Sequence, residues 1–337
     1  MFLKWNAGTE NAFLSYAKAL KESGFNVINL VHPEAKIIPA LEKNNLDHIK
    51  TKFLGKFGKS DIFTILYFKY LIKKHRIDLV LAHQGRLIQL FKKSCTRKTK
   101  LIGINHGHNP KHSVGTDLAI TLNSKAFKET IKLGQRKERI TLLPNGIDLS
   151  ESYYAKKEGI DKFTIGSYGR FSFEKGYDIL IESLNILNIK NVDFKCFIGG
   201  SGIEEKNLKR LIQKYNLQEK IQLIGWVTNQ KEFLKKIDLF ILPSRREEQG
   251  LTVLESMKNY TPVLATENFG CLDLIKDKEN GFLTPLNDAE KMAEKVKFII
   301  NNRHSLDDIA KNAYHHLRSK YSYQTFKSKL LKTIKSI

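Results

Sequence analysis

Short apolar runs alternate with amphipathic stretches along nearly all of the 337 residues. The runs are rich in β-branched residues, which predicts buried strands, and the stretches repeat apolar residues every three or four positions, which predicts helices. Strands that alternate with helices favour an α/β fold with parallel sheets. The predicted strands are 26–31, 78–83, 101–106, 118–123, 140–144, 163–168, 193–199, 221–225, 239–242, 263–266 and 281–284. The predicted helices include 10–23, 62–75, 124–133, 177–188, 203–215, 228–235, 251–259, 288–302 and 323–337.

The chain is long enough for two domains, each with its own core. A polar segment, 149–161, ends the first alternating series and is the predicted linker. We therefore expect an N-terminal domain of residues 1–155, a C-terminal domain of residues 156–320 and a final helix within residues 321–337. Both domains are predicted to be doubly wound, because strands and helices alternate in each.

Composition narrows the class of protein only slightly. The hydrophobic fraction of 41% is ordinary for a globular protein, and no apolar run reaches the roughly 18–20 residues that span a bilayer. The first ten residues, MFLKWNAGTE, lack the apolar region of a secretory signal. Cys95, Cys196 and Cys271 lie far apart without metal-ligand spacing, which favours a reduced, cytoplasmic location.

Positive charge dominates, with a formal net charge of +22. Residues 1–155 hold 26 Lys and Arg against 12 Asp and Glu, whereas residues 156–337 hold 31 against 23, so the first part is the more basic. Its basic runs at 50–59, 69–76 and 92–100 fit an anionic membrane surface or an acidic acceptor. An AT-rich coding bias explains the excess of lysine equally well. Nucleic acid is not an expected partner, because no recognition module accompanies the charge.

The strongest chemical signal is a pair of carboxylates, Glu247 and Glu255, between two predicted strands. Glu247 lies in the loop that follows a strand, at the end where open parallel sheets bind ligands. A helix predicted from Gly250 offers its first N–H groups, from Gly250, Leu251 and Thr252, to a phosphate or to sugar hydroxyls. Carboxylates in turn accept hydrogen bonds from hydroxyls. The alternative is two exposed acids that stabilise a helix N-terminus.

A second signal is a pair of cations at Gly-rich turns. Arg170 follows Gly169 at a predicted strand end, and Lys175 precedes Gly176 at a predicted helix start. Arg offers a planar fork and Lys a point charge, so the two together suit a diphosphate. Two solvated surface cations are the alternative.

These motifs resemble the signature of glycosyltransferase family 4, which combines a Glu-x7-Glu motif with Gly-Arg and Glu-Lys-Gly turns. The stretch Pro144-Asn145-Gly146-Ile147-Asp148 is similar to a further family signature. The resemblance covers nearly the whole chain and is most specific over residues 144–285. It implies a GT-B fold, in which two Rossmann-like doubly wound domains face a central cleft and the last helix crosses back to the first domain. It also implies a retaining glycosyltransferase that uses a nucleotide sugar.

The resemblance gives the main candidates their roles. Arg170 and Lys175 would hold the donor diphosphate. Glu247, as a catalytic residue, would bind the sugar hydroxyls and support positive charge at the anomeric carbon. Glu255 would hold the nucleotide ribose, and the first turn from Gly250 would contribute to donor binding.

Other candidates lie outside the two motifs. Gly8 matches a glycine loop over the donor phosphates. His106, with His108 in reserve, matches a histidine near the donor sugar and the acceptor, although a structural role at a strand end is the alternative. Trp226 either lies beside the nucleotide base or packs half-buried. The turn 199–202 looks like a phosphate loop, but a tight strand-to-helix connection explains it more simply.

The sequence departs from the family pattern in three places. Gln249 replaces an aromatic residue, Tyr260 replaces a glycine, and 269–273 replaces a Gly-Gly-x-x-Glu turn. These departures bear on the identity of the donor more than on the fold.

We therefore expect a metal-independent enzyme without a cofactor, which moves a sugar from a UDP- or GDP-sugar to an envelope glycan or lipid-linked acceptor. No Asp-x-Asp pair follows a strand, and no metal-ligand spacing occurs. The expected location is the cytoplasm, peripheral to the inner face of the membrane. The alternatives are a GT-B nucleotide-sugar epimerase, a phosphorylase, whose cofactor-lysine motif we do not find, and a non-catalytic protein that binds sugar nucleotides or anionic surfaces.

The N-terminus carries a separate expectation. The resemblance implies that the first domain opens with a central strand, and only Met1–Trp5 precede the glycine loop at Asn6–Gly8. A strand commonly needs about five to six residues. Either Met1–Trp5 form an abbreviated strand, or the chain begins upstream of Met1.

Overall fold

The computed structural model describes residues 7–52, 61–106, 109–150, 152 and 162–337. The chain divides into two compact units. Unit 1 comprises residues 1–146 and 323–337, and unit 2 comprises residues 147–322. The predicted linker, 149–161, lies largely outside the described residues. All described strand pairings are parallel, which confirms the predicted α/β class.

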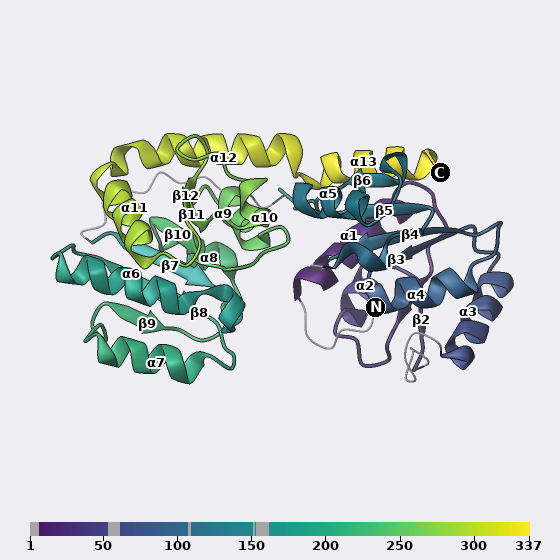
Figure 1. Cartoon of the computed structure of the whole chain (residues 1–337), viewed down its shortest axis with the longest axis horizontal. Helices are drawn as coiled ribbons and strands as arrows, with labels where there is room; N and C mark the ends of the chain where they lie inside the picture. Colours follow the sequence, from purple (N-terminus) through teal and green to yellow (C-terminus); the bar gives the residue numbers. More distant parts are fainter. Residues whose placement is uncertain (1–6, 53–60, 107–108, 151, 153–161) are drawn as a thin grey trace. The chain divides into compact units, whose positions relative to one another are not determined.

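Unit 2 contains one six-stranded parallel sheet (Figure 1). Its strands are β7 (Thr164–Tyr168), β8 (Lys195–Gly199), β9 (Ile221–Leu223), β10 (Leu239–Leu242), β11 (Val263–Thr266) and β12 (Phe282–Thr284). Their order is β12-β11-β10-β7-β8-β9, so the chain builds outward from β7 to β9, returns, and builds outward again from β10. The reversal between β7 and β10 is a topological switch point, where open α/β sheets bind ligands beyond the strand C-termini.

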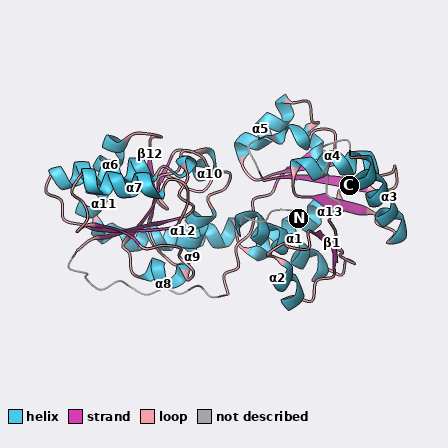
Figure 2. Ribbon diagram, turned by 90° about the horizontal axis from the view of Figure 1, so that it is seen from below, coloured by secondary structure: helices cyan, strands magenta, loops and turns pink. Residues whose placement is uncertain are grey.

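Helices cover both faces of this sheet (Figure 2). They are α6 (Tyr177–Ile189), α7 (Glu205–Lys214), α8 (Gln230–Lys235), α9 (Leu251–Lys258), α10 (Phe269–Leu272), α11 (Ala289–Asn301) and α12 (Leu306–Lys320). One buried cluster joins α6, α7 and α11 to the first face, through residues such as Leu184 and Val296. Another joins α8, α9 and the C-terminal half of α12 to the second face, through Leu254 and Leu317. Because both faces are buried, strands such as β10 are continuous apolar runs.

The described strands of unit 1 form two parallel sheets, β3-β4-β5-β6 and the pair β1-β2. The strands are β1 (Asn29–Val31), β2 (His48–Lys50), β3 (Leu79–Ala82), β4 (Lys100–Asn105), β5 (Leu118–Thr121) and β6 (Ile140–Leu142). The helices are α1 (Ala7–Lys21), α2 (Ile38–Lys43), α3 (Ile62–Lys74), α4 (Gly85–Ser94), α5 (Ser124–Lys132) and α13 (Tyr323–Lys335). Helices α3 and α4 pack on one face of the larger sheet, and α1 and α13 pack on the other. Met1–Trp5, for which an abbreviated strand is one of the two expectations, lie outside the described residues.

The last helix, α13, belongs to unit 1. Phe326 and Leu330 are buried in one cluster with Tyr16 of α1 and the strands β4 and β5. Glu22, just after α1, accepts hydrogen bonds from Tyr323 Oη at 3.1 Å and from Lys327 Nζ at 2.8 Å. The C-terminal helix therefore completes the same core as the first helix of the chain.

Candidate active site

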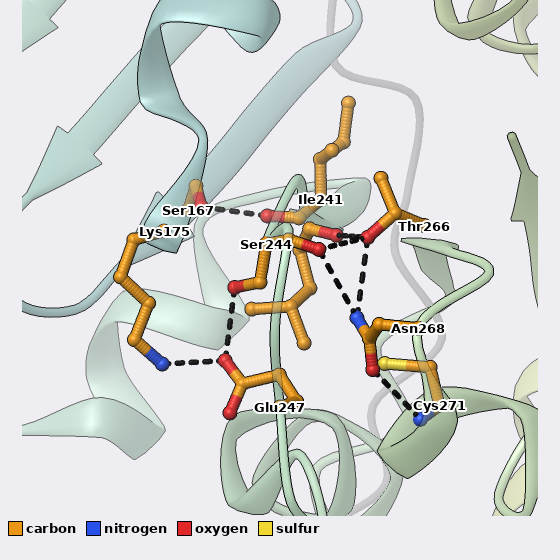
Figure 3. A network of polar contacts seen from close by, with 9 residues as sticks. Ser167, Lys175, Ile241, Ser244, Glu247, Thr266, Asn268 and Cys271 are labelled. Atoms are coloured by element: carbon orange, nitrogen blue, oxygen red, sulfur yellow. Dashed lines mark hydrogen bonds and ion pairs between the residues drawn. The ribbon is translucent and has the colours of Figure 1, made fainter. Parts of the chain in front are cut away.

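Polar side chains at the C-terminal ends of β7, β10 and β11 form hydrogen bonds that join the strands (Figure 3). Ser167 Oγ donates to the Ile241 carbonyl at 2.6 Å, which ties β7 to β10 across the switch point. Thr266 Oγ1 and Asn268 Nδ2 both donate to the Ser244 carbonyl, just after β10. These bonds satisfy buried polar groups and fix the path of the chain as it leaves each strand.

Lys175 and Glu247 form an ion pair beside this network (Figure 3). Glu247 Oε1 accepts from the Lys175 ammonium and also from Ser244 Oγ, the latter at 2.9 Å. The Lys175 and Glu247 side chains are 24% and 13% exposed, so both charges are largely withdrawn from water. A charge in such a place needs a partner. The structure thus joins Lys175, the residue predicted to bind the diphosphate, to Glu247, the predicted catalytic carboxylate.

Arg245 fastens the loop that carries Glu247 to the turn that carries Lys175. Its guanidinium donates to both oxygens of Asp178, at 2.8 and 2.7 Å, and to the Phe173 carbonyl at 2.7 Å. It also lies 4.1 Å from the centroid of the Phe173 ring. This planar, bidentate contact is one that lysine cannot reproduce. Sequence analysis missed Arg245, although it directly follows the Pro-Ser of the motif.

The N-terminus of α9 adjoins this loop. Gly250, the residue before the helix, has a φ of +69°, in the left-handed region. Gly270 N–H donates to the Glu247 carbonyl at 3.2 Å, and a Cβ at Gly270 would lie only 2.9 Å from that oxygen. Gly250, Leu251 and Thr252 contribute the first N–H groups of the helix, a type of group that binds anions.

Glu255 of α9 is tied to the end of β7. Its Oε2 accepts a hydrogen bond from Tyr168 Oη at 2.5 Å. Burial raises the pKa of Glu255, and the Tyr168 hydrogen bond and the Lys258 charge oppose that rise. Burial, together with the neighbouring Glu255, raises the pKa of Tyr168 well above its ordinary value. Tyr168 therefore stays protonated and donates to the carboxylate. Sequence analysis did not identify Tyr168.

Arg170 and Trp226 lie in loops at the same edge of the sheet, after β7 and after β9. Arg170 is exposed, and Trp226 is 57% exposed. The Trp226 ring is therefore not a core residue. Among the described residues, neither side chain forms a hydrogen bond or ion pair with Lys175 or Glu247.

The glycine turn after β8 serves close packing. A Cβ at Gly200 would lie 2.0 Å from the Gly169 carbonyl, and one at Gly202 would lie 2.3 Å from the Phe171 carbonyl. The turn therefore packs against the segment that carries Arg170. This close packing is what the simpler interpretation, a tight strand-to-helix connection, predicts.

In unit 1, His106 directly follows β4 and pairs with His83, which follows β3. His83 Nδ1 and His106 Nε2 lie 2.9 Å apart, and the rings stack with centroids 5.1 Å apart. Burial lowers the pKa of His106 to about 4, and burial and the adjacent His106 lower the pKa of His83. Both rings are therefore neutral at neutral pH. Gly8 lies in the first turn of α1, and His108 lies outside the described residues.

A cavity of about 600 Å³ lies inside unit 1, and no residue of the Glu-x7-Glu motif lines it. Side chains such as Phe13, Leu71 and Phe91 line it, from α1, α3 and α4. Its lining is mainly apolar with a few polar side chains such as Arg76, whereas a diphosphate and a sugar need several cations and hydrogen-bonding groups. The strand ends of unit 2 are the better candidate for the active site.

Two family profiles together match nearly the whole chain. Residues 7–151 match the family described as Glycosyltransferase Family 4, and residues 152–316 match Glycosyl transferases group 1. The chain belongs to the family 4 glycosyltransferases of the GT-B type, and it is a transferase.

Similar proteins cover most of the chain. An uncharacterized glycosyltransferase of Haemophilus influenzae is 28% identical over 314 residues, which are 88% of this chain and 87% of that protein. The lipopolysaccharide core biosynthesis glycosyltransferase LpsE of Rhizobium meliloti is 24% identical over 344 residues, which are 98% and 96% of the two chains. The crystal structure of Anabaena HepE in complex with UDP superimposes with a TM-score of 0.85 at 19% identity, over 100% of this chain and 99% of that one. This last likeness supports the fold alone, and it agrees with the predicted GT-B fold.

Tyr260 shows how the chain accommodates a departure from the family pattern. The family has glycine here, and Tyr260 keeps a φ of +51°, in the left-handed region. Its ring stacks on Tyr314 of α12, with centroids 4.3 Å apart. This contact offsets part of the cost of the backbone conformation, which is of order 1–3 kcal/mol.

Gly176→Ala is predicted to damage the site. Gly176 has a φ of +66°, and a Cβ there would lie 2.1 Å from the Pro243 carbonyl. The substitution therefore pushes the Lys175 turn away from the Glu247 loop. We expect turnover to fall by about tenfold or more, because small displacements of positioned groups are costly.

The matched control is Gly134→Ala in unit 1, where φ is +98° and a Cβ meets nothing within 4 Å. It carries the backbone strain without the collision, so thermal stability should fall while turnover is kept. Wild-type turnover in a folded Gly176→Ala enzyme would show that the two segments need not stay in register.

Proposed function

We propose that this enzyme transfers a sugar from a UDP- or GDP-sugar to an envelope glycan or lipid-linked acceptor, with retention at the anomeric carbon and without a metal ion. The observation that carries the proposal is the Lys175–Glu247–Ser244 contact at the switch point, next to the N-terminus of α9. The name of LpsE, which refers to lipopolysaccharide core biosynthesis, supports an envelope acceptor. The HepE complex with UDP supports a uridine donor.

Lys175 and Arg170 hold the donor diphosphate in this proposal. Without donor, the Lys175 ammonium pairs with Glu247. A diphosphate brings more negative charge to the ammonium than one carboxylate does, so it competes for Lys175 and frees Glu247. The freed carboxylate then accepts hydrogen bonds from the sugar hydroxyls and supports positive charge as the anomeric bond breaks.

The remaining candidate residues of unit 2 bind the nucleotide in this proposal. Glu255 accepts from the ribose hydroxyls, and the exposed Trp226 ring lies beside the base. The first N–H groups of α9, from Gly250, Leu251 and Thr252, bind the phosphates or the sugar. These donors and the two cations meet the charge that develops on the leaving diphosphate, which is the support for metal independence. Among the described residues, no group of three or more His, Cys, Asp or Glu side chains could hold a metal ion.

The unit 1 candidates serve the sugar and the acceptor. His106 is neutral at neutral pH, so it offers a hydrogen bond to a hydroxyl and not a positive charge. Gly8, in the first turn of α1, leaves room for backbone to approach a phosphate. We place the enzyme in the cytoplasm, at the inner face of the membrane, where a lipid-linked acceptor is presented. No described helix is both long and apolar enough to cross that membrane.

Product analysis tests the proposed reaction. The purified protein is incubated with a panel of UDP- and GDP-sugars and envelope lipid or glycan extract, with a chelator present, and the products are identified by mass spectrometry. We expect nucleotide release that depends on acceptor, and an acceptor heavier by one sugar. Glu247→Gln should lower turnover by about 100-fold without weakening UDP binding, because it removes charge that acts on the sugar and leaves Lys175 available to the diphosphate.

Other outcomes each exclude a part of the proposal. Nucleotide binding without acceptor-dependent release identifies a binding protein, and conversion of the donor to an isomer identifies an epimerase. Activity that returns only with a divalent cation contradicts metal independence.

Tyr168→Phe tests the role of Glu255 through pH. The Tyr168 hydrogen bond opposes the burial that raises the pKa of Glu255. Its removal raises that pKa further, so Glu255 becomes protonated at higher pH and UDP binding is lost earlier as the pH falls. Calorimetric titration with UDP between pH 5 and 8 measures this shift.

Tyr321→Phe is the control, since it removes a buried hydroxyl that donates to the Asp273 carbonyl at 2.9 Å in the same unit. Tyr321→Phe should leave the dependence of UDP binding on pH as it is in the wild-type protein. If Tyr168→Phe and wild-type protein share one profile, Glu255 does not act as a charged ribose ligand.

A further inference from the structure

Helix α3 is apolar on two opposite faces. Its sequence, IFTILYFKYLIKK, contains nine large apolar or aromatic residues and no acid. One face is buried in unit 1, where Phe68 and Ile72 belong to a core cluster and the Phe68 ring stacks on Phe91 of α4, with centroids 4.4 Å apart. Among the described residues, this face packs the helix into the core of its unit.

The other face exposes four large side chains. Ile62 is 66% exposed, Phe63 72%, Leu66 56% and Tyr70 56%. Their spacing of three, four and seven residues places them side by side on the helix. A surface helix of a soluble protein normally carries polar residues opposite its buried face. Single exposed apolar residues are ordinary, but a contiguous group marks an interaction site.

Three exposed lysines, Lys69, Lys73 and Lys74, share the helix with this group. Lys73 and Lys74 lie in the last turn, and Lys69 lies one residue before Tyr70. Lys74 Nζ lies 5.6 Å from the centroid of the Tyr70 ring, so the cation and the apolar face adjoin. Apolar side chains beside exposed cations suit the boundary between acyl chains and anionic headgroups, where lysine stems lie along apolar surface and the ammonium stays in water.

We propose that the exposed face of α3 is a membrane-docking surface, which inserts Ile62, Phe63, Leu66 and Tyr70 into an anionic leaflet with the three lysines at the headgroups. This inference deepens the proposed contact with the membrane, on which it rests, by naming the surface that makes it. A two-fold contact with a second copy suits this face less well, because it would bring the same lysines of both chains together.

Co-sedimentation with vesicles tests the proposal. The wild-type chain should bind vesicles of phosphatidylglycerol and phosphatidylethanolamine, bind phosphatidylcholine vesicles weakly, and lose binding as salt rises. The double variant Phe63→Ser/Leu66→Ser should lower the partition by about tenfold or more, because it removes two inserted apolar side chains. Lys73→Glu/Lys74→Glu should lower it by about fivefold or more for each lysine replaced.

Matched controls change the same kinds of residue elsewhere. Ile189→Ser/Leu133→Ser replaces two exposed apolar residues at the C-terminal ends of α6 and α5, and Lys206→Glu/Lys297→Glu replaces two exposed lysines of unit 2. Both should bind vesicles nearly as wild type does. UDP affinity should be the same in all these variants, so loss of vesicle binding is separated from failure of the proposed chemistry.

Three results would overturn the assignment of α3. The first is vesicle binding that the α3 and control variants lose equally. The second is binding that does not distinguish anionic from neutral lipid. The third is a wild-type dimer in light scattering that Phe63→Ser/Leu66→Ser abolishes while vesicle binding persists, which would make the face a subunit contact. An absence of any transfer product with normal, α3-dependent vesicle binding would overturn the proposed function alone.

Discussion

The ion pair between Lys175 and Glu247 is the interaction on which the candidate site depends. Each partner comes from a different loop, one after β7 and the other after β10, so the pair spans the point where the strand order of unit 2 reverses. Both side chains are largely withdrawn from water, and neither charge could remain there alone without a large desolvation cost. A ligand with negative charge can take the place of Glu247 as the partner of Lys175. A ligand with hydroxyl groups can take the place of Lys175 as the partner of Glu247. A nucleotide sugar has both.

The surrounding structure holds these two loops in register. Arg245 donates hydrogen bonds to Asp178 and to the Phe173 carbonyl. The Ser244 carbonyl accepts hydrogen bonds from two side chains at the end of β11. Gly176 and Gly270 let the neighbouring backbones approach more closely than a side chain would allow. Rigid strand ends joined by short, fastened loops are what a catalytic site needs for preorganised charge.

The sequence predicted the strands of unit 2 well, because both faces of that sheet are buried and its strands are unbroken apolar runs. It also predicted Lys175, Glu247 and Glu255 as candidates, because they fall in short motifs between those runs. It did not predict their partners. Arg245 and Asp178 are 67 residues apart, and Tyr168 and Glu255 are 87 apart, so no local pattern relates them.

Short elements such as α2 and β2 have too few residues for a period to appear. The exposure of α3 was also hidden, since the sequence of a helix with two opposite apolar faces does not tell which face is buried.

The most direct test of this account is the affinity of Lys175→Ala for UDP and for GDP, measured by calorimetry beside Lys206→Ala, which removes an exposed lysine of α7. A charge-assisted hydrogen bond contributes about 1.5–3 kcal/mol, so the account predicts at least about tenfold weaker binding of the nucleotide that the wild-type protein prefers. Lys206→Ala should bind as wild type does. Equal affinity in all three proteins would contradict the claim that the Lys175–Glu247 pair is the donor site.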